Sequence, residues 1–220
     1  MFCFLPGFLV YGQTVNINKG YEKGAREGIY KIGTWQYFDS TGNLELEIDY
    51  DNRILNYLER DTSAYVIFKD GQWTTSTLDI HPRYIGSWVE FYDILNSSLD
   101  YPMQARYRDV VGKVYITFEV DTTGQAINFE TVNDIGCECA YECKRVLQLV
   151  PNYWLVATKD GKKYKSRFII SCEFGIILDG KRLEERQRKS RKNKSGLPKM
   201  PLARELDGIS YVIKKGYKPE

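Results

Sequence analysis

Apolar and polar residues alternate strictly between Gly112 and Val120, which is the pattern of a β-strand that buries one face. The residues on that face are Val114, Ile116, Phe118 and Val120. The turn sequence Asp121-Thr122-Thr123-Gly124 follows them. We therefore expect residues 125–132 to return antiparallel to the first strand and complete a hairpin.

Two other segments have the spacing of amphipathic helices. Apolar residues recur at helical intervals from Trp88 to Leu99, and the helix must end before Pro102. The segment from Glu138 to Val150 is also amphipathic, and Pro151 ends it. Its apolar stripe consists of Cys139, Cys143, Val146, Leu147 and Val150.

The last apolar pattern is again that of a strand, from Phe168 to Phe174, with a turn at Asp160-Gly161-Lys162-Lys163 before it. Its inward set is Phe168, Ile170, Cys172 and Phe174. The order of helix, two strands, helix and strand predicts an α+β fold. In this fold, three antiparallel strands form a layer that two helices cover on one face.

The region before the first helix is rich in Tyr, Trp and Gly and has short alternating runs. Gly33 to Leu44 predicts strand, turn and strand, with turn residues at 40–43. Tyr65 to Phe68, followed by Lys69 to Trp73, predicts a second hairpin. We expect residues 13–96 to form an N-terminal region of antiparallel β-hairpins.

The composition excludes some classes of protein. Of 220 residues, 43% are hydrophobic and 14% aromatic, which excludes wholesale disorder. The net charge is only +2, and nine Lys or Arg residues against two Glu lie between Lys181 and Lys199. A globally basic nucleic-acid-binding protein is therefore not expected. The basic tail, residues 179–220, reads as a solvated extension, as a charged contact for an anionic partner, or as a short docking strand at Leu206 to Ile213.

Residues 1–12 are apolar but too short to span a bilayer, which needs about 20 residues. They read either as a secretory signal ending near Gly12 or as a buried N-terminal strand. The signal interpretation predicts an exported protein. Four cysteines besides Cys3 then remain in an oxidising compartment.

Three of these cysteines are predicted to approach one another. Cys139 and Cys143 lie on one helix face, and Cys172 is on the inward face of the last strand. Three interpretations stay open: a disulfide joining Cys172 to Cys139 or Cys143, a thiolate zinc site with Cys137 nearby, or buried free thiols. We expect no cofactor, and the metal site is the least favoured interpretation.

We expect no enzymatic activity. The only histidine, His81, precedes Pro82 in a predicted loop, and no Ser or Cys lies near it in sequence. Glu119 and Asp121 are spaced like paired carboxylates, but we expect solvent to surround both of them.

Several motifs in the second half resemble the TonB C-terminal domain family. They are Tyr101-Pro102 followed by Ala105, Gly112-Lys113-Val114 with Phe118-x-Val120-Asp121-x-x-Gly124, and Pro151-x-x-Trp154. The resemblance covers about residues 99–178, and it implies a domain over 97–178. The pattern Gly33-x-Trp35-x-Tyr37-Phe38-Asp39-x-x-Gly42-x-Leu44 resembles one MORN-like hairpin repeat.

The resemblance to the TonB family implies periplasmic peptide binding by β-strand addition, linked to transmembrane transport. The implied partner is a segment of an outer-membrane TonB-dependent receptor, with inner-membrane motor proteins or peptidoglycan as further partners. The alternative is a structural envelope scaffold or a glycan-binding protein without energy coupling. The candidate binding edge comprises Arg167, Phe168, Ile169, Ile170, Ser171, Cys172, Glu173 and Phe174.

Overall fold

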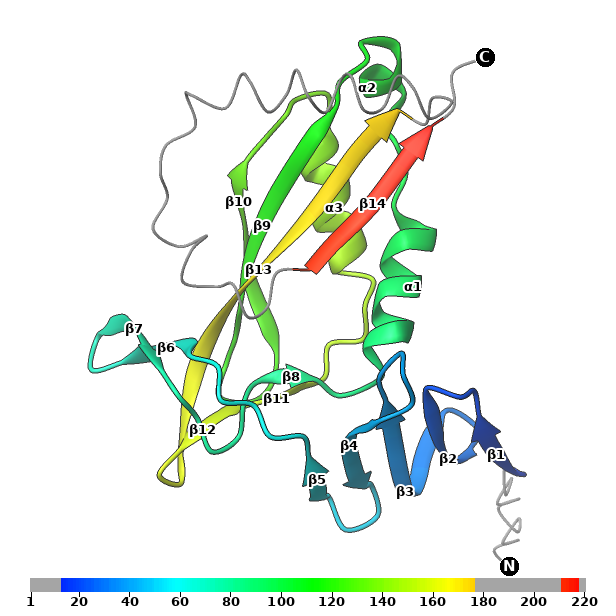
Figure 1. Cartoon of the computed structure of the whole chain (residues 1–220), viewed down its shortest axis with the longest axis vertical. Helices are drawn as coiled ribbons and strands as arrows, with labels where there is room; N and C mark the ends of the chain where they lie inside the picture. Colours follow the sequence, from blue (N-terminus) through cyan, green and yellow to red (C-terminus); the bar gives the residue numbers. More distant parts are fainter. Residues whose placement is uncertain (1–12, 177–210, 218–220) are drawn as a thin grey trace, which may run out of the picture. The chain divides into compact units, whose positions relative to one another are not determined.

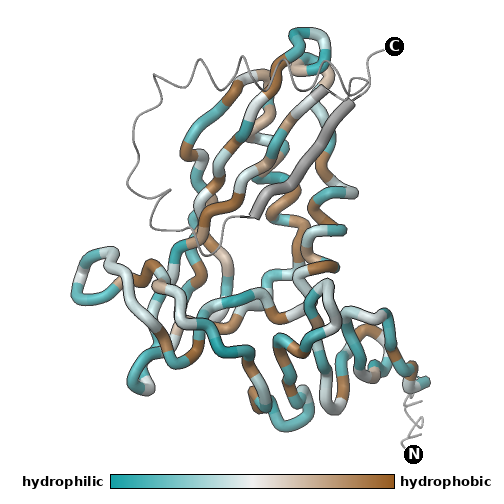
Figure 2. Tube along the Cα trace, viewed as in Figure 1, coloured by the Kyte–Doolittle hydropathy of each residue, from teal (hydrophilic) through white to brown (hydrophobic). Residues whose placement is uncertain are grey.

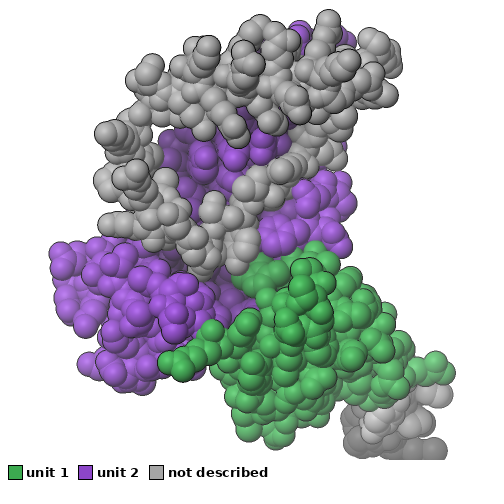
Figure 3. Space-filling model, in the orientation of Figure 1, with its two compact units in different colours: residues 1–60, 86–90 green, residues 61–85, 91–220 purple. Residues whose placement is uncertain are grey.

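β-Strands dominate the computed structural model, which describes residues 13–176 and 211–217. Within these residues the strands form three sheets, of five, seven and two strands. The chain divides into two compact units (Figure 3). Unit 1 ends at Arg60 and also includes Gly86–Glu90, whereas unit 2 contains Asp61–Ile85 and the chain from Phe91 on. The predicted signal, residues 1–12, and most of the predicted tail lie outside the described residues.

Unit 1 is an antiparallel meander in which each strand pairs with the next along the chain (Figure 1). The strands are β1 (Thr14–Asn18), β2 (Glu22–Glu27), β3 (Tyr30–Phe38), β4 (Leu44–Asp49) and β5 (Ile54–Leu58). Trp35 and Tyr37 of β3 are buried together with Leu46 and Ile48 of β4. The strand, turn and strand predicted over Gly33 to Leu44 are therefore present, and their alternating apolar residues form the core of this unit.

Local chemistry explains two features of the meander. The carboxylate of Asp39 accepts hydrogen bonds from the backbone N–H groups of Thr41 and Asn43, both at 2.8 Å, which closes the turn between β3 and β4. A hydrogen bond from the Thr41 hydroxyl, together with these backbone bonds, lowers the pKa of Asp39 to about 2. On β2, a Cβ atom at Gly24 would lie 2.3 Å from the ring of Trp35, so only glycine lets this ring pack on the strand.

Unit 2 is built on a sheet with strand order β10-β9-β13-β6-β7, and β12 and β14 also pair with β13 (Figure 1). Its strands are β6 (Tyr65–Lys69), β7 (Gln72–Ser76), β8 (Arg83–Tyr84), β9 (Gly112–Val120), β10 (Ala126–Asn133), β11 (Trp154–Leu155), β12 (Ala157–Lys159), β13 (Lys162–Ile176) and β14 (Tyr211–Tyr217). Its helices are α1 (Trp88–Ser98, which begins in unit 1), α2 (Met103–Tyr107) and α3 (Cys139–Leu147). β8 and β11 form the small two-stranded sheet.

Helix α3 packs against β9 and β10 and covers one face of the large sheet (Figure 1). Apolar and polar residues alternate along β9 and β13, as the colours in Figure 2 show. The apolar side chains on one face of these two strands are buried, and the rings of Phe118, Phe168 and Trp154 lie 5.1–5.2 Å apart between their centres. This aromatic cluster is the centre of the core of unit 2.

The predicted fold class is wrong. A layer of three strands with two helices was expected, whereas the described residues are mostly strand and the large sheet has seven strands. The sheet is larger for three reasons. The hairpin β6–β7, expected in the N-terminal region, pairs with β13, β12 also pairs with β13, and β14 comes from the predicted tail. Consequently, the units divide near Arg60 and at 86–90, whereas the predicted boundary lay between residues 96 and 97.

None of the helices in the described residues is both long enough and apolar enough to cross a lipid bilayer.

Candidate peptide-binding edge

The predicted edge, Arg167 to Phe174, lies in the middle of the large sheet. β9 pairs antiparallel with Ser166–Phe174 of β13, and its register does not shift. β6 pairs with Lys165 and Ser166, and β14 pairs parallel with Ile170–Ile176. Because β9 already pairs with one side of β13, both β6 and β14 lie along the other side. Ile170 to Phe174 are therefore not an open edge in this structure, because a strand of the same chain pairs with them.

The side chains of β13 alternate between two faces as predicted. Phe168, Ile170, Cys172 and Phe174 are all buried on the face that belongs to the core. Phe174 packs edge-on against Tyr101, with ring centres 5.4 Å apart. On the opposite face, Glu173 lies 3.8 Å from the ammonium group of Lys113 on β9. The backbone of β13 is thus held from both faces while its outer side pairs with β14.

Glu119 of β9 is the centre of an ion cluster beside β13. Its carboxylate accepts hydrogen bonds from Arg167 at 2.9 Å and from Asn128 at 3.0 Å, and it forms an ion pair with Lys165 at 3.2 Å. The guanidinium of Arg167 also stacks on the ring of Trp73, 3.9 Å from its centre. Burial raises the pKa of Glu119, but these hydrogen bonds and charges outweigh it and lower the pKa overall.

The expectation that solvent surrounds Glu119 is therefore wrong, since only 8% of the residue is exposed. Asp121 has a local structural role instead. Its carboxylate accepts hydrogen bonds from the backbone N–H groups of Thr123 at 2.8 Å and Gln125 at 3.0 Å, which holds the turn between β9 and β10.

The structure brings two of the candidate cysteines into contact. Cys143 of α3 and Cys172 of β13 are both buried, and a hydrogen bond joins their side chains. This hydrogen bond and burial raise the pKa of Cys143. Burial raises the pKa of Cys139 to about 11. All four described cysteines are free thiols here, so a disulfide stays a prediction. The described residues contain no group of three or more metal-ligating side chains.

β10, which pairs with β9 on the side away from β13, is an irregular edge strand of the large sheet. Its pairing with β9 shifts register between Ile127 and Glu130 and again between Thr131 and Asn133. Asn128, within the first shift, has a left-handed backbone with φ of 54°. Such β-bulges bend an edge strand and interrupt its row of hydrogen-bonding groups.

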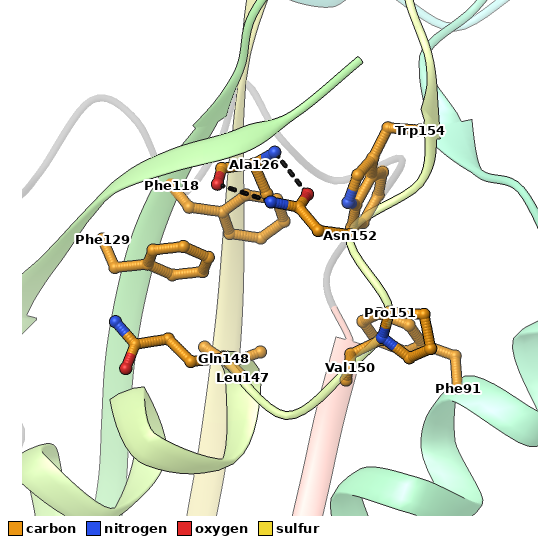
Figure 4. Close-up of a pocket in the computed structure, with 10 residues that line it drawn as sticks. All are labelled: Phe91, Phe118, Ala126, Phe129, Leu147, Gln148, Val150, Pro151, Asn152 and Trp154. Atoms are coloured by element: carbon orange, nitrogen blue, oxygen red, sulfur yellow. Dashed lines mark hydrogen bonds between the residues drawn. The ribbon is translucent and has the colours of Figure 1, made fainter.

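An asparagine side chain completes the pairing at the start of β10 (Figure 4). The backbone N–H of Ala126 donates to Oδ1 of Asn152 at 2.5 Å, and Nδ2 of Asn152 donates to the carbonyl of Ala126 at 3.1 Å. The amide therefore takes the place that the peptide group of a neighbouring strand would occupy. Next to it lies a pocket of about 200 Å³, with Phe118, Phe129 and Trp154 among its lining residues.

His81, the only histidine, has a packing role. Its ring stacks on Tyr65, with centres 5.8 Å apart and planes 14° apart, and burial lowers its pKa. The hydroxyl of Tyr65 donates a hydrogen bond to Asp61. This arrangement supports β6 and its connection.

Sequence reasoning did not identify three features of the site: the pairing of β14 with β13, the ion cluster at Glu119, and the Asn152 cap on β10. The predicted docking strand at Leu206 to Ile213 overlaps β14 in Tyr211–Ile213, which is the one signal of its position. The other two features join residues that are far apart in sequence, and no local pattern indicates them.

Comparison of the chain with family models, with curated proteins and with solved structures found no match. The family relationship suggested by the sequence motifs therefore stays a prediction.

Proposed function

We propose that the protein binds an extended peptide segment by adding it as a strand to the outer side of β13, and that it does so without catalysing a reaction. One observation carries the proposal: β14, an extended segment remote in sequence, pairs in unbroken register with Ile170–Ile176. Strand addition uses backbone N–H and C=O groups for affinity, so an edge that accepts one extended segment is suited to accept another.

The chemistry of this edge supports the proposal. The unbroken pairing with β9 keeps the N–H and C=O groups of β13 in a regular row from Ser166 to Phe174. The side chains of Phe168, Ile170 and Cys172 are buried in the core, and they fix the orientation of β13 from that face of the sheet. A rigid, regular edge lowers the ordering cost of binding, because only the incoming peptide loses conformational freedom.

The partner we propose is a periplasm-facing segment of an outer-membrane receptor, and the process is transmembrane transport. These two points rest on the sequence motifs and on the signal-like segment, residues 1–12. An envelope scaffold is the alternative function, but no contact in the described residues favours it.

The proposal is tested by adding synthetic peptides to the ¹⁵N-labelled full chain and following the backbone amides by NMR. The peptides are seven-residue segments of outer-membrane receptors, with the sequence of β14 as the reference. We expect binding to shift amide signals of Ile170–Ile176 and to leave those of unit 1 unchanged. The matched control is the same peptide with N-methylated backbone amides, which lack the N–H donors and should bind far more weakly.

Two outcomes would overturn the proposal. One is that no peptide perturbs β13 even at saturating concentration. The other is that the N-methylated peptide binds as tightly as its parent, because such binding does not depend on the backbone donors.

A further inference from the structure

We infer that β14 is an intramolecular occupant of the peptide-binding edge, and that a partner peptide binds fully only when β14 has left it. This inference rests on the proposed function and adds its regulation. β14 pairs with Ile170–Ile176, which includes five of the eight residues predicted to form the binding edge. One row of backbone groups can pair with only one strand at a time, so β14 and a peptide exclude each other.

Three of the strands that pair with β13, namely β9, β6 and β14, differ in how firmly they are held. β9 pairs antiparallel along Ser166–Phe174, continues into the hairpin with β10, and buries Val114, Ile116 and Phe118 in the core. β6 belongs to the hairpin β6–β7, and it buries Tyr65, Val66 and Ile67. Displacement of either strand would therefore expose core side chains of unit 2.

β14 differs from both of these strands. It is parallel to β13, and parallel pairing is slightly less stable per residue than antiparallel pairing. Among the residues that the structure describes it forms no hairpin, and residues 177–210, 34 in all, separate it from β13. Its sequence includes Lys214, Lys215 and Gly216, residue types that are depleted in strands. β14 is consequently the strand that can leave at the lowest cost in free energy.

Occupancy by β14 sets the apparent affinity for a peptide. If the edge is open in one molecule of ten, the apparent dissociation constant is about tenfold higher than that of the open edge. A receptor segment must therefore outcompete β14, and weakly pairing peptides are rejected. The device makes binding selective for partners that pair with β13 better than residues 211–217 do.

The experiment compares two full-length variants. The variant Val212→Pro/Ile213→Pro removes two adjacent backbone N–H donors of β14. In a parallel strand only alternate residues bond to a given neighbour, so one of these two donors faces β13. The matched control, Val212→Thr/Ile213→Val, keeps both donors and β-branched side chains. The probe is a fluorescein-labelled peptide with the sequence of β14, and its binding is measured by fluorescence anisotropy.

We expect the proline variant to bind the probe about tenfold or more tightly than the control does. Without peptide, the amides of Ile170–Ile176 should exchange with solvent faster in the proline variant, and the probe should restore their protection. Equal binding by both variants would overturn the inference and leave the proposed function standing. Binding by neither variant, with the edge amides of the proline variant unprotected, would overturn the proposed function itself.

A measurement on the unmodified chain does not depend on how the proline variant folds. As unlabelled probe is added to the ¹⁵N-labelled protein, we expect the amides of Tyr211–Tyr217 to lose protection while those of Gly112–Val120 keep theirs. Probe binding that leaves β14 protected would contradict the inference.

Discussion

Two of the strands that flank the β9–β13 pair in unit 2, β10 and β14, pair with it in different ways. On the side of β9, β10 pairs through two register shifts, and the amide of Asn152 covers its first residue. On the side of β13, β14 pairs in unbroken register over Ile170–Ile176. Both flanking strands belong to the same sheet, and they differ in the regularity of the backbone.

This difference in regularity shows at which side of the sheet a further strand can be added. Bulges and a side-chain cap make β10 a poor template, because its N–H and C=O groups do not form one evenly spaced row. β13 presents such a row, and the chain itself uses it. Regularity of the edge, more than its exposure in the structure, is therefore the reason why we propose the outer side of β13 as the site of strand addition.

The largest effect should come from the aromatic cluster that supports both edges. Phe168 of β13 and Phe129 of β10 each stack on Phe118, at 5.2 Å and 5.3 Å between ring centres. Phe168 is buried and Phe129 is only half-buried. We expect Phe168→Ala to lower the free energy of unfolding by about 3–5 kcal/mol and Phe129→Ala by about 1–2 kcal/mol. Urea unfolding measures both, and equal losses would contradict the view that β13 is the more firmly supported strand.

The second largest effect on stability should come from the thiol pair Cys143 and Cys172, which joins α3 to β13. Among the described residues, β10 has no such pair of cysteines. We expect Cys143 and Cys172 to form a disulfide when the protein folds in an oxidising compartment, and to stabilise it by about 2–4 kcal/mol. Urea unfolding with and without reductant measures the gain. Cys143→Ala should abolish the gain, whereas the control Cys139→Ala should retain it. If alkylation after reduction adds no mass beyond that of the unreduced protein, no disulfide is present.

The ion cluster should contribute less. Glu119→Gln is expected to cost about 1.5–3 kcal/mol at neutral pH, because it removes a charged partner from Arg167 and Lys165. The pKa of Glu119 is lowered in the folded state from an ordinary value of 4.5. Its contribution is therefore complete above that value and is lost as the pH falls through the lower folded pKa.

Denaturation curves at several pH values test this prediction, and the difference between parent and variant should disappear at the acid end. Glu130→Gln on the exposed part of β10 is the control, and it should change stability little. A difference that persists unchanged in acid would show that the charge of Glu119 is not the cause.

The smallest effect should come from the cap on β10. Asn152→Ala removes two hydrogen bonds at a solvent-exposed position, so we expect a loss of about 1 kcal/mol. The amide of Ala126 should exchange with solvent faster in this variant, and Asn152→Asp, which keeps the acceptor, should restore most of its protection. Unchanged exchange at Ala126 in Asn152→Ala would show that the side chain does not protect this edge.

Local periodicity predicted those elements whose partners lie close in sequence. The alternation in Val114–Val120 and the stripe with Cys139 and Cys143 correspond to β9 and α3, because burial of one face imposes the period directly. The approach of Cys172 to the helix also followed from these two patterns. The hairpin over Gly33–Leu44 was likewise predictable, because the residues that favour its turn lie directly between its two strands.

Pairing between distant segments was not predictable in this way. Nothing in Tyr65–Phe68 distinguishes a strand that pairs with Lys165 and Ser166 from one that stays with its neighbours, since register across a sheet is not a local property. The amide of Asn152 acts through position alone, and an Asn in a loop has many other roles. β14 pairs with Ile170–Phe174 of the predicted edge, and the pattern of β13 could not show that residues 211–217 pair with it.

The late position of β14 has a consequence for the order in which the protein is made. β13 is complete when residues 177–210 are still to be added, which takes roughly 2–7 s at 5–20 residues per second. During these seconds the regular row of donors and acceptors on β13 has no β14 to pair with. An unpaired row of this kind is a template for pairing with another chain, so the incomplete polypeptide carries a risk of aggregation that β14 removes once it pairs with Ile170–Ile176.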